Sequence, residues 1–179
     1  MDMTFFNRIA KSNASTNCRN GIRDFVLENP EYLKDVITFA TDLTNKNHYK
    51  AVWIIEMLAE THPELLVSFI DSICNIAPQY KHESAIRGIS RTILFLTTSK
   101  KISLTEKQQE KFIETSLDRL IGNDKIAPKV FAMYALLHYA KTQEWIKEEL
   151  RNIIDNDFAN QSAGYKIKSS PYARKKNLF

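Results

Sequence analysis

Histidines are the side chains that most often bind metals or transfer protons, so their spacing decides whether such chemistry is expected. No two of the four have the four-residue spacing that lets a helix face hold a metal ion. The only histidine followed by an acid, in His82-Glu83, lacks a second histidine at the spacing of a zinc-protease motif. The sequence therefore predicts no metal site. The four histidines are His48, His62, His82 and His138.

The two cysteines give no sign of nucleophilic or redox chemistry. Cys18 and Cys74 each fall within a predicted helix and have no CxxC partner, so we expect two small, half-buried hydrophobic residues. The four glycines are isolated, which excludes a glycine-rich phosphate loop. We predict no catalytic residue and no cofactor. An enzyme of unrecognised type remains an alternative, because a missing motif is weak evidence against catalysis.

Glu56 is the polar residue that most needs an explanation. It interrupts the apolar run Val52-Trp-Ile-Ile-Glu-Met-Leu-Ala59, and a carboxylate on so apolar a helix needs a cation or water beside it. Arg87 or Arg91, on a neighbouring helix, could supply the cation. One interpretation is a structural ion pair that bridges two helix pairs. The other is a groove that grips an extended peptide or another acidic partner.

A wider binding surface follows from aligning the second helices of successive pairs. An alanine in each helix is followed two positions later by an aromatic or basic residue. The alanines are Ala51, Ala85, Ala127 and Ala163. In a solenoid, matched positions on the second helices line the concave face. The predicted binding residues are Trp53, Glu56, Arg87, Arg91, Lys129, Tyr165 and Lys166, of which the first five are expected to share one face.

Recurring sequence motifs mark where the predicted helices begin. The sequence Asn29-Pro-Glu-Tyr-Leu33 returns as His62-Pro-Glu-Leu-Leu66, and each copy opens a predicted helix. We expect Asn29 to accept a hydrogen bond from the first turn, and proline tolerates the first helical position because the N–H it lacks would be unpaired there. Thr105-Glu-Lys-Gln108 has the form of a capping box and predicts another start.

Apolar periodicity fills in the remaining elements. It predicts helices over 17–28, 30–43, 48–61, 63–77, 83–98, 105–121, 126–142 and 145–157. The first helices of successive pairs start near 30, 63, 105 and 144, at intervals of about 33, 42 and 39 residues. A period near 40 with two helices per unit is typical of HEAT and armadillo solenoids. We predict an all-α, HEAT/armadillo-like α-solenoid of about four helix pairs, with an irregular helical bundle as the alternative.

Composition and charge fit this prediction. The 179 residues include only 4 Gly and 5 Pro, too few turn-forming residues for an all-β fold. The net charge of +4 arises after Asp157, where five basic residues and no acid follow, so the rest of the chain carries about −1. A nucleic-acid-binding protein would be expected to spread its basic charge along a groove. The five are Lys166, Lys168, Arg174, Lys175 and Lys176.

The length favours a single domain over residues 1–179. Residues 1–16 are expected as a leading segment, and residues 169–179 as a basic tail that could be disordered. No apolar run approaches the ~18–20 residues needed to span a membrane, and the N-terminus lacks the features of a signal peptide, which indicates a cytoplasmic protein. The sequence predicts no particular oligomeric state.

Four stretches carry a resemblance to a known family. They are Ala51-Val-Trp-Ile-Ile-Glu56, His62-Pro-Glu-Leu-Leu66, Lys129-Val-Phe-Ala-Met-Tyr-Ala-Leu-Leu137 and Phe158-Ala-Asn-Gln-Ser-Ala-Gly-Tyr-Lys166. Over about residues 17–168 the chain resembles small, uncharacterised bacterial proteins with HEAT-like helical repeats. The resemblance implies the fold and little about activity. Members sometimes carry the label adenylosuccinate lyase. That enzyme is far longer and uses a serine-rich loop, and nothing like Ser-Ser-x-Met-Pro occurs here.

These observations predict a non-catalytic scaffold that binds another macromolecule, in the first place a protein or peptide, through the concave face. Nucleic-acid binding, as in the HEAT-like DNA glycosylases that recognise alkylated bases, is the first alternative. That chemistry requires aromatic and acidic residues on a basic concave face. Here Trp145 falls on a first helix and the chain before the tail carries about −1, so the nucleic-acid function is less favoured.

Overall fold

The computed structural model describes residues 3–157, and all regular secondary structure within that range is helical. The α-helices are α1 (Met3–Lys11), α2 (Thr16–Glu28), α3 (Leu33–Thr41), α4 (His48–Thr61), α5 (Ile70–Ile76), α6 (Glu83–Thr98), α7 (Glu106–Ile121), α8 (Ile126–Tyr139) and α9 (Glu144–Asp157). The predicted all-α class is confirmed. The basic tail 169–179 and the predicted binding residues Tyr165 and Lys166 lie outside the described residues.

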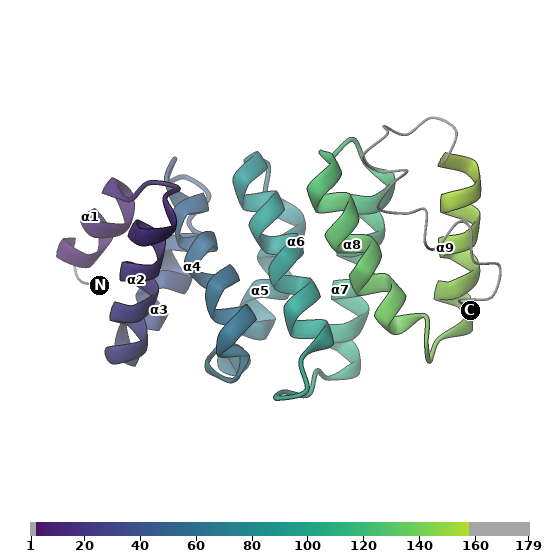
Figure 1. Cartoon of the computed structure of the whole chain (residues 1–179), viewed down its shortest axis with the longest axis horizontal. Coiled ribbons are helices and arrows are strands. Elements are labelled where there is room, and N and C mark those ends of the chain that lie inside the picture. Colours follow the sequence, from purple (N-terminus) through teal and green to yellow (C-terminus); the bar gives the residue numbers. More distant parts are fainter. Residues whose placement is uncertain (1–2, 158–179) are drawn as a thin grey trace.

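The helices stand in two rows (Figure 1). The helices α4, α6 and α8 pack side by side with α2 at one end, and α3, α5 and α7 stand behind them. The pairs α4–α6 and α6–α8 of the first row contact one another more closely than the neighbours α3–α5 and α5–α7 of the second. Closer packing on one side is what the concave side of a solenoid requires. We therefore call α2, α4, α6 and α8 the inner row and α3, α5 and α7 the outer row. The solenoid prediction is confirmed.

Local sequence fixes the two ends of α7 as expected. Thr105 Oγ1 accepts a hydrogen bond from the Gln108 N–H at 3.3 Å, and Gln108 Oε1 accepts one from the Thr105 N–H at 3.0 Å, which completes the predicted capping box. At the other end, the Gly122 N–H donates to the Asp118 carbonyl at 2.9 Å. A side chain at residue 122 would place its Cβ 2.8 Å from that same carbonyl oxygen, so the helix ends where glycine fits.

The two proline starts differ from the prediction. Each opens with a 3-10 segment, η1 (Pro30–Tyr32) and η2 (Pro63–Phe69), before the α-helix begins. Asn29 does not cap the helix that follows; its side-chain amide donates to the Phe25 carbonyl at 2.9 Å and so satisfies the end of α2. A single residue separates α2 from η1, so the asparagine that should start one helix is used to close the previous one.

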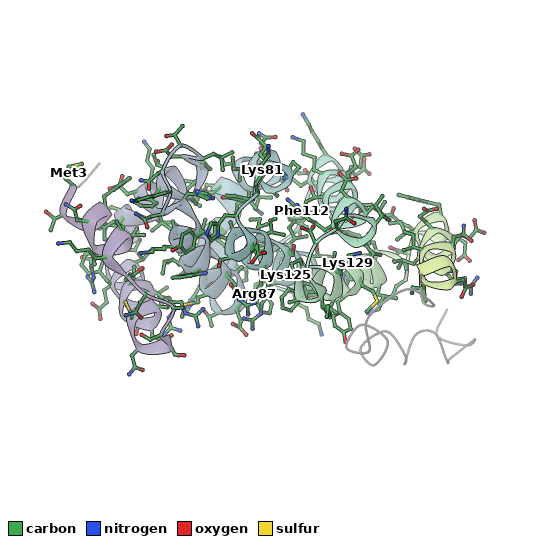
Figure 2. All side chains as sticks on the ribbon, turned by 90° about the horizontal axis from the view of Figure 1, so that it is seen from above. Met3, Lys81, Arg87, Phe112, Lys125 and Lys129 are labelled. Carbon is green, nitrogen blue, oxygen red and sulfur yellow. The ribbon has the colours of Figure 1, made fainter. Side chains whose placement is uncertain are left out.

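Buried apolar side chains from both rows fill the space between them (Figure 2). The main cluster runs from α1 to α8 and includes Phe112, which is fully buried between the rows. A second cluster joins α7, α8 and α9 through Ile113, Leu136 and Leu150. Residues 3–11, expected as part of a leading segment, form α1 and bury Phe5 and Ile9 in the main cluster, so this helix is part of the core.

Candidate functional site

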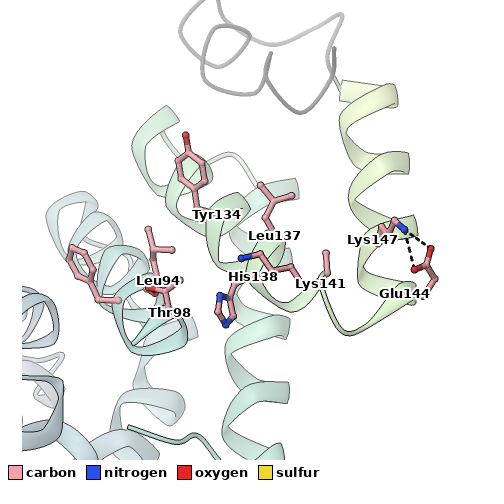
Figure 3. A pocket seen from close by; sticks show the side chains of 10 residues that line it. Leu94, Thr98, Tyr134, Leu137, His138, Lys141, Glu144 and Lys147 are labelled. Atoms are coloured by element: carbon pink, nitrogen blue, oxygen red, sulfur yellow. Dashed lines mark hydrogen bonds and ion pairs between the residues drawn. The ribbon is translucent and has the colours of Figure 1, made fainter. Parts of the chain in front are cut away.

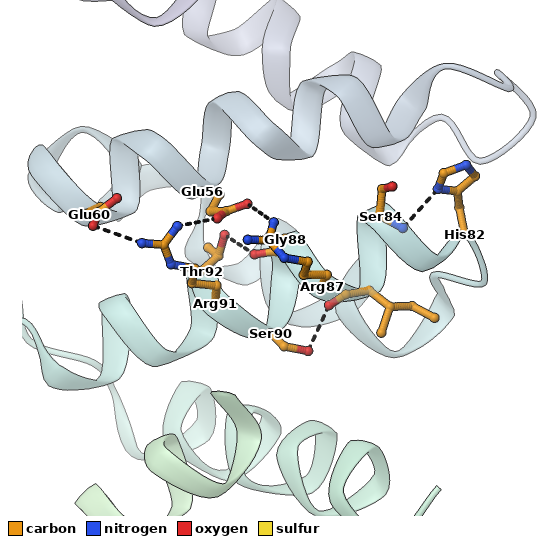
Figure 4. Close-up of polar contacts among 10 residues, drawn as sticks. Glu56, Glu60, His82, Ser84, Arg87, Gly88, Ser90, Arg91 and Thr92 are labelled. Atoms are coloured by element: carbon orange, nitrogen blue, oxygen red, sulfur yellow. Dashed lines mark hydrogen bonds and ion pairs between the residues drawn. The ribbon is translucent and has the colours of Figure 1, made fainter. Parts of the chain in front are cut away.

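Glu56 lies on α4 in the middle of the inner row and is only 1% exposed (Figure 4). Its Oε1 atom accepts a hydrogen bond from Arg91 Nη1 at 2.7 Å, and its Oε2 atom lies 3.8 Å from Arg87 Nη1. Arg91 Nη2 also donates to Glu60 Oε1 at 3.1 Å. Both arginines that the sequence analysis named as possible partners, Arg87 and Arg91, therefore lie beside Glu56. We call Glu56, Glu60, Arg87 and Arg91 the ion-pair cluster.

Gly88 allows α6 to approach α4 closely at this point. A Cβ atom on Gly88 would lie 2.9 Å from Val52 Cγ1 and 3.3 Å from Glu56 Oε2. The Glu56 Oε2 atom is inaccessible to solvent and has no hydrogen-bond partner among the described residues. One oxygen of the carboxylate is therefore held by Arg91, while the other faces the backbone of Gly88 and the more distant Arg87. This geometry closes the gap between the two helices.

The two arginines differ in their exposure and in the number of contacts that they make within the fold. The Arg91 side chain is 30% exposed, makes two ion pairs, and places its guanidinium 4.8 Å from the centre of the Phe95 ring. The Arg87 side chain is 44% exposed, and its contact with Glu56 is longer than a hydrogen bond. Arg87 therefore retains donors that can reach solvent or a ligand beside the inner row.

Trp53 lies one turn before Glu56 on α4, and the residue is 8% exposed. Its ring packs edge-on against Tyr49 at a centroid distance of 5.2 Å, and the Arg19 guanidinium lies 5.9 Å from its centre. Arg19 belongs to α2 and Tyr49 to α4, so these contacts lie toward α2, whereas the ion-pair cluster lies between α4 and α6. The Trp53 side chain is therefore largely covered by α2 and by its own helix.

Lys129 does not belong to the exposed surface of α8. It is 7% exposed, and it lies two positions from the half-exposed Phe131, about 200° around the helix. From Arg91 onward, the partly or fully exposed positions of α6 recur on α8 after 43 residues, whereas the alanine alignment used a step of 42. The matched pairs are Arg91 with Tyr134, Leu94 with Leu137, Phe95 with His138, and Thr98 with Lys141. Arg87 has no exposed counterpart on α8 in either alignment, because Lys129 and Val130 are both 7% exposed.

Tyr134 and the last three of these pairs line a groove that the sequence analysis missed (Figure 3). Its volume is about 710 Å³. The groove is lined by Leu94, Phe95 and Thr98 on α6, by Tyr134, Leu137 and His138 on α8, and by Lys141, Glu144 and Lys147 where the chain enters α9. Beneath it, Thr97 Oγ1 and Tyr139 Oη share a buried hydrogen bond of 3.2 Å that ties α6 to α8. We call this site the α6–α8 groove.

The charges at the α6–α8 groove are mainly positive. Glu144 is bound to Lys147 at 3.1 Å, and Lys141 makes no ion pair with residues 3–157. Burial, and to a lesser degree the charge on Lys141, lowers the pKa of His138 below its ordinary value. The imidazole is therefore neutral at pH 7, and Lys141 is the uncompensated charge at this end of the groove.

Cys74 and His48 are both buried within the fold. Burial raises the pKa of the Cys74 thiol to about 11, which leaves it without thiolate character at neutral pH. His48 Nδ1 bonds to the Asn45 carbonyl at 2.8 Å, and its ring stacks on Tyr80. The described residues contain no group of three or more histidines, cysteines or acids that could hold a metal ion. None of their helices is long and apolar enough to cross a membrane.

The paired helices, their spacing and their two-row packing have a counterpart among known families. A family model described as a HEAT repeat domain matches residues 7–168. The chain belongs to the HEAT repeat family. No curated protein and no solved structure gives a match. HEAT repeats generally mediate protein interactions and are typically non-catalytic. In this HEAT repeat protein, the ion-pair cluster and the α6–α8 groove lie next to each other on the inner row, joined by the contact between Arg91 and Phe95.

Proposed function

We propose that this HEAT repeat protein is a non-catalytic scaffold that binds another protein through the inner row. The proposed surface consists of the ion-pair cluster and the adjoining α6–α8 groove, with the largely buried Trp53 beside the cluster on α4. Membership of a family whose repeats generally mediate protein interactions supports the class of function. The observation that carries the choice of surface is Arg87, a 44% exposed arginine held beside a buried carboxylate.

Arg87 suits the recognition of a carboxylate on a partner. A guanidinium presents five N–H donors in a planar fork and binds carboxylates through two parallel hydrogen bonds. Because Arg91 already supplies the short hydrogen bond to Glu56, a partner can engage Arg87 without leaving the buried carboxylate unpaired. Arginine is enriched among the residues that dominate binding energy at protein interfaces.

The experiment is a pull-down from an extract of the source organism, run with and without nuclease, that compares the wild-type chain with Arg87→Gln. The substitution removes the cation without placing a second carboxylate beside Glu56. Lys34→Gln is the matched control, because Lys34 is an exposed cation on α3 in the outer row. We expect a dominant protein that survives nuclease, and about tenfold weaker recovery with Arg87→Gln than with Lys34→Gln.

Two results would contradict this proposal. Equal recovery by Arg87→Gln and Lys34→Gln would remove the inner row as the binding surface. Loss of all partners on nuclease treatment would replace protein binding with nucleic-acid binding, in which the basic residues beyond Asp157 become the first residues to test.

A further inference from the structure

The α6–α8 groove differs from the rest of the inner row because no side chain of residues 3–157 fills it. Its middle is formed by Leu94, Phe95 and Leu137, all of which are partly exposed. A volume of about 710 Å³ is in the range of sites that enclose several side chains of a ligand. An apolar opening of this size favours an occupant that brings large apolar side chains of its own.

One end of this apolar middle carries an unpaired cation. Lys141 lines the groove and makes no ion pair with residues 3–157, whereas Arg91 contacts the groove residue Phe95 but is matched by Glu56 and Glu60. Among residues 3–157, the only carboxylate that lines the groove is Glu144, which is already paired with Lys147. An occupant with acidic residues beside its apolar anchor would therefore be attracted at Lys141, and a basic occupant would be repelled there.

The same charges argue against the other occupants that could be considered. The chain's own segment after Asp157 carries five basic residues and no acid, so the charge of Lys141 would oppose it. A nucleic-acid backbone would match the cations but would leave Leu94 and Leu137 without apolar contacts. A protein segment satisfies both the charge and the apolar requirement.

We propose that the α6–α8 groove binds an acidic protein segment that inserts one or two large apolar side chains between Leu94 and Leu137, with an acidic residue beside Lys141. This inference rests on the proposed scaffold function and specifies the chemistry of the partner. Lys141 acts as the free cation of the site, whereas Arg91 is already bound to Glu56 and Glu60.

The test uses a displayed library of random twelve-residue peptides, selected on the immobilised full-length chain. Enriched peptides are then synthesised with a fluorophore and titrated by fluorescence anisotropy. We expect enriched sequences to contain more Asp and Glu than Lys and Arg, together with at least one large apolar residue. Leu137→Ala and Lys141→Glu should each weaken their binding by about tenfold or more.

Matched controls separate the groove from general effects of charge and hydrophobicity. Ile121→Ala removes an apolar side chain that is 60% exposed on α7, and Lys34→Glu reverses an exposed cation on α3. Both should bind the peptides as the wild type does. Thermal unfolding followed by circular dichroism identifies any variant that fails to fold, in which case Leu137→Met and Lys141→Gln take the place of the harsher substitutions.

The inference is overturned if no peptide is enriched, if the enriched peptides are basic, or if the groove variants bind as tightly as the controls. The native partner recovered with the wild-type chain distinguishes this failure from failure of the scaffold function. Release of that partner by Arg87→Gln but not by Leu137→Ala would refute the groove and leave the scaffold intact. Absence of any native partner and of any enriched peptide would refute both.

Discussion

The two gaps beside α6 have opposite characters. Toward α4, Gly88 brings the backbones together, and the buried Glu56 with its two arginines closes the gap with charge. Toward α8, a hydrogen bond between Thr97 and Tyr139 ties the helices at depth, but the surface above remains an open apolar groove. Helix α6 thus makes a close contact with α4 on one side and borders an open groove with α8 on the other.

The difference shows where this solenoid derives its rigidity and where it has room for a ligand. A buried carboxylate is stabilising only while its cation is present, so the α4–α6 contact depends on a few particular side chains. The α6–α8 contact depends on apolar packing below the groove, and the residues that line the groove are partly exposed. Substitution of Arg91 or Gly88 should therefore change mainly the free energy of unfolding, whereas substitution of Leu137 or Lys141 should change mainly binding.

We call the α4–α6 contact at Glu56 the closed side of α6, and the α6–α8 groove its open side. Substitution of Arg91 should weaken the closed side most. In Arg91→Ala, Glu56 keeps only the 3.8 Å contact with Arg87. Its side chain is 2% exposed, so the buried carboxylate loses its hydrogen bond to Arg91 without gaining access to water. Loss of one partner from a buried pair lowers the free energy of unfolding by ~3–5 kcal/mol, and partial exposure of Arg91 reduces this to roughly 2–4 kcal/mol. Urea denaturation measures the change.

The control for this substitution is an ion pair of the same length on the surface. Lys125 and Glu83 approach to 2.6 Å, but their side chains are 71% and 69% exposed. Lys125→Ala should change the free energy of unfolding by less than ~1 kcal/mol, because exposed pairs are weakened by solvent. If the two variants lose the same stability, the α4–α6 contact is not held by the buried carboxylate.

Gly88 provides a second, smaller test of the closed side. In Gly88→Ala the new Cβ would lie 2.9 Å from Val52 Cγ1, so one helix must shift, and we expect a loss of roughly 1–3 kcal/mol. Gly21→Ala on α2 meets no atom within 4 Å and should gain about 0.5–1 kcal/mol from its higher helix propensity. Opposite shifts in the urea midpoint confirm the close approach; shifts of the same sign contradict it.

The closed side could be predicted from sequence because its signals are local. Glu56 in an apolar run indicates that a cation must lie nearby. Arg87 and Arg91, four residues apart on the next inner helix, can supply that cation. The capping box of α7 was likewise readable from Thr105 and Gln108. In each case the interacting groups lie within one helix or on neighbouring inner helices, so a repeat alignment is enough to find them.

The open side could not be predicted because it depends on register and on the course of the chain after α8. An alignment of alanines paired Lys129 with Arg87, but Lys129 is buried, and the partly exposed residues that α8 gives to the groove are Tyr134, Leu137 and His138. A helix turns by about 100° per residue, so an error of one position moves a side chain to another face. The 3-10 starts were missed for a related reason, since Asn29 had two helix ends to satisfy and the sequence did not indicate which.

The smallest expected effect is a pH dependence that belongs to the open side. Burial and Lys141 lower the pKa of His138 in the folded chain, so the unfolded chain binds more protons near pH 6.5. The free energy of unfolding should therefore fall as the pH drops through about 6.5, and should stop falling once folded His138 is protonated. His82 adds a contribution of the same sign, because burial and His48 lower its pKa. Urea midpoints at about pH 7.5 and about pH 5.5 measure the loss.

His138→Gln should reduce this loss without abolishing it, because His82 remains. Lys141→Gln should reduce it less, since it removes only the second cause of the lowered pKa and leaves the burial of the imidazole unchanged. A bound acidic segment would stabilise the protonated His138 imidazole. With such a segment bound, the His138 contribution to the free energy of unfolding should therefore rise rather than fall as the pH drops. If His138→Gln loses as much stability as the wild type between the two pH values, His138 is not the neutral, partly buried group that lines the open side.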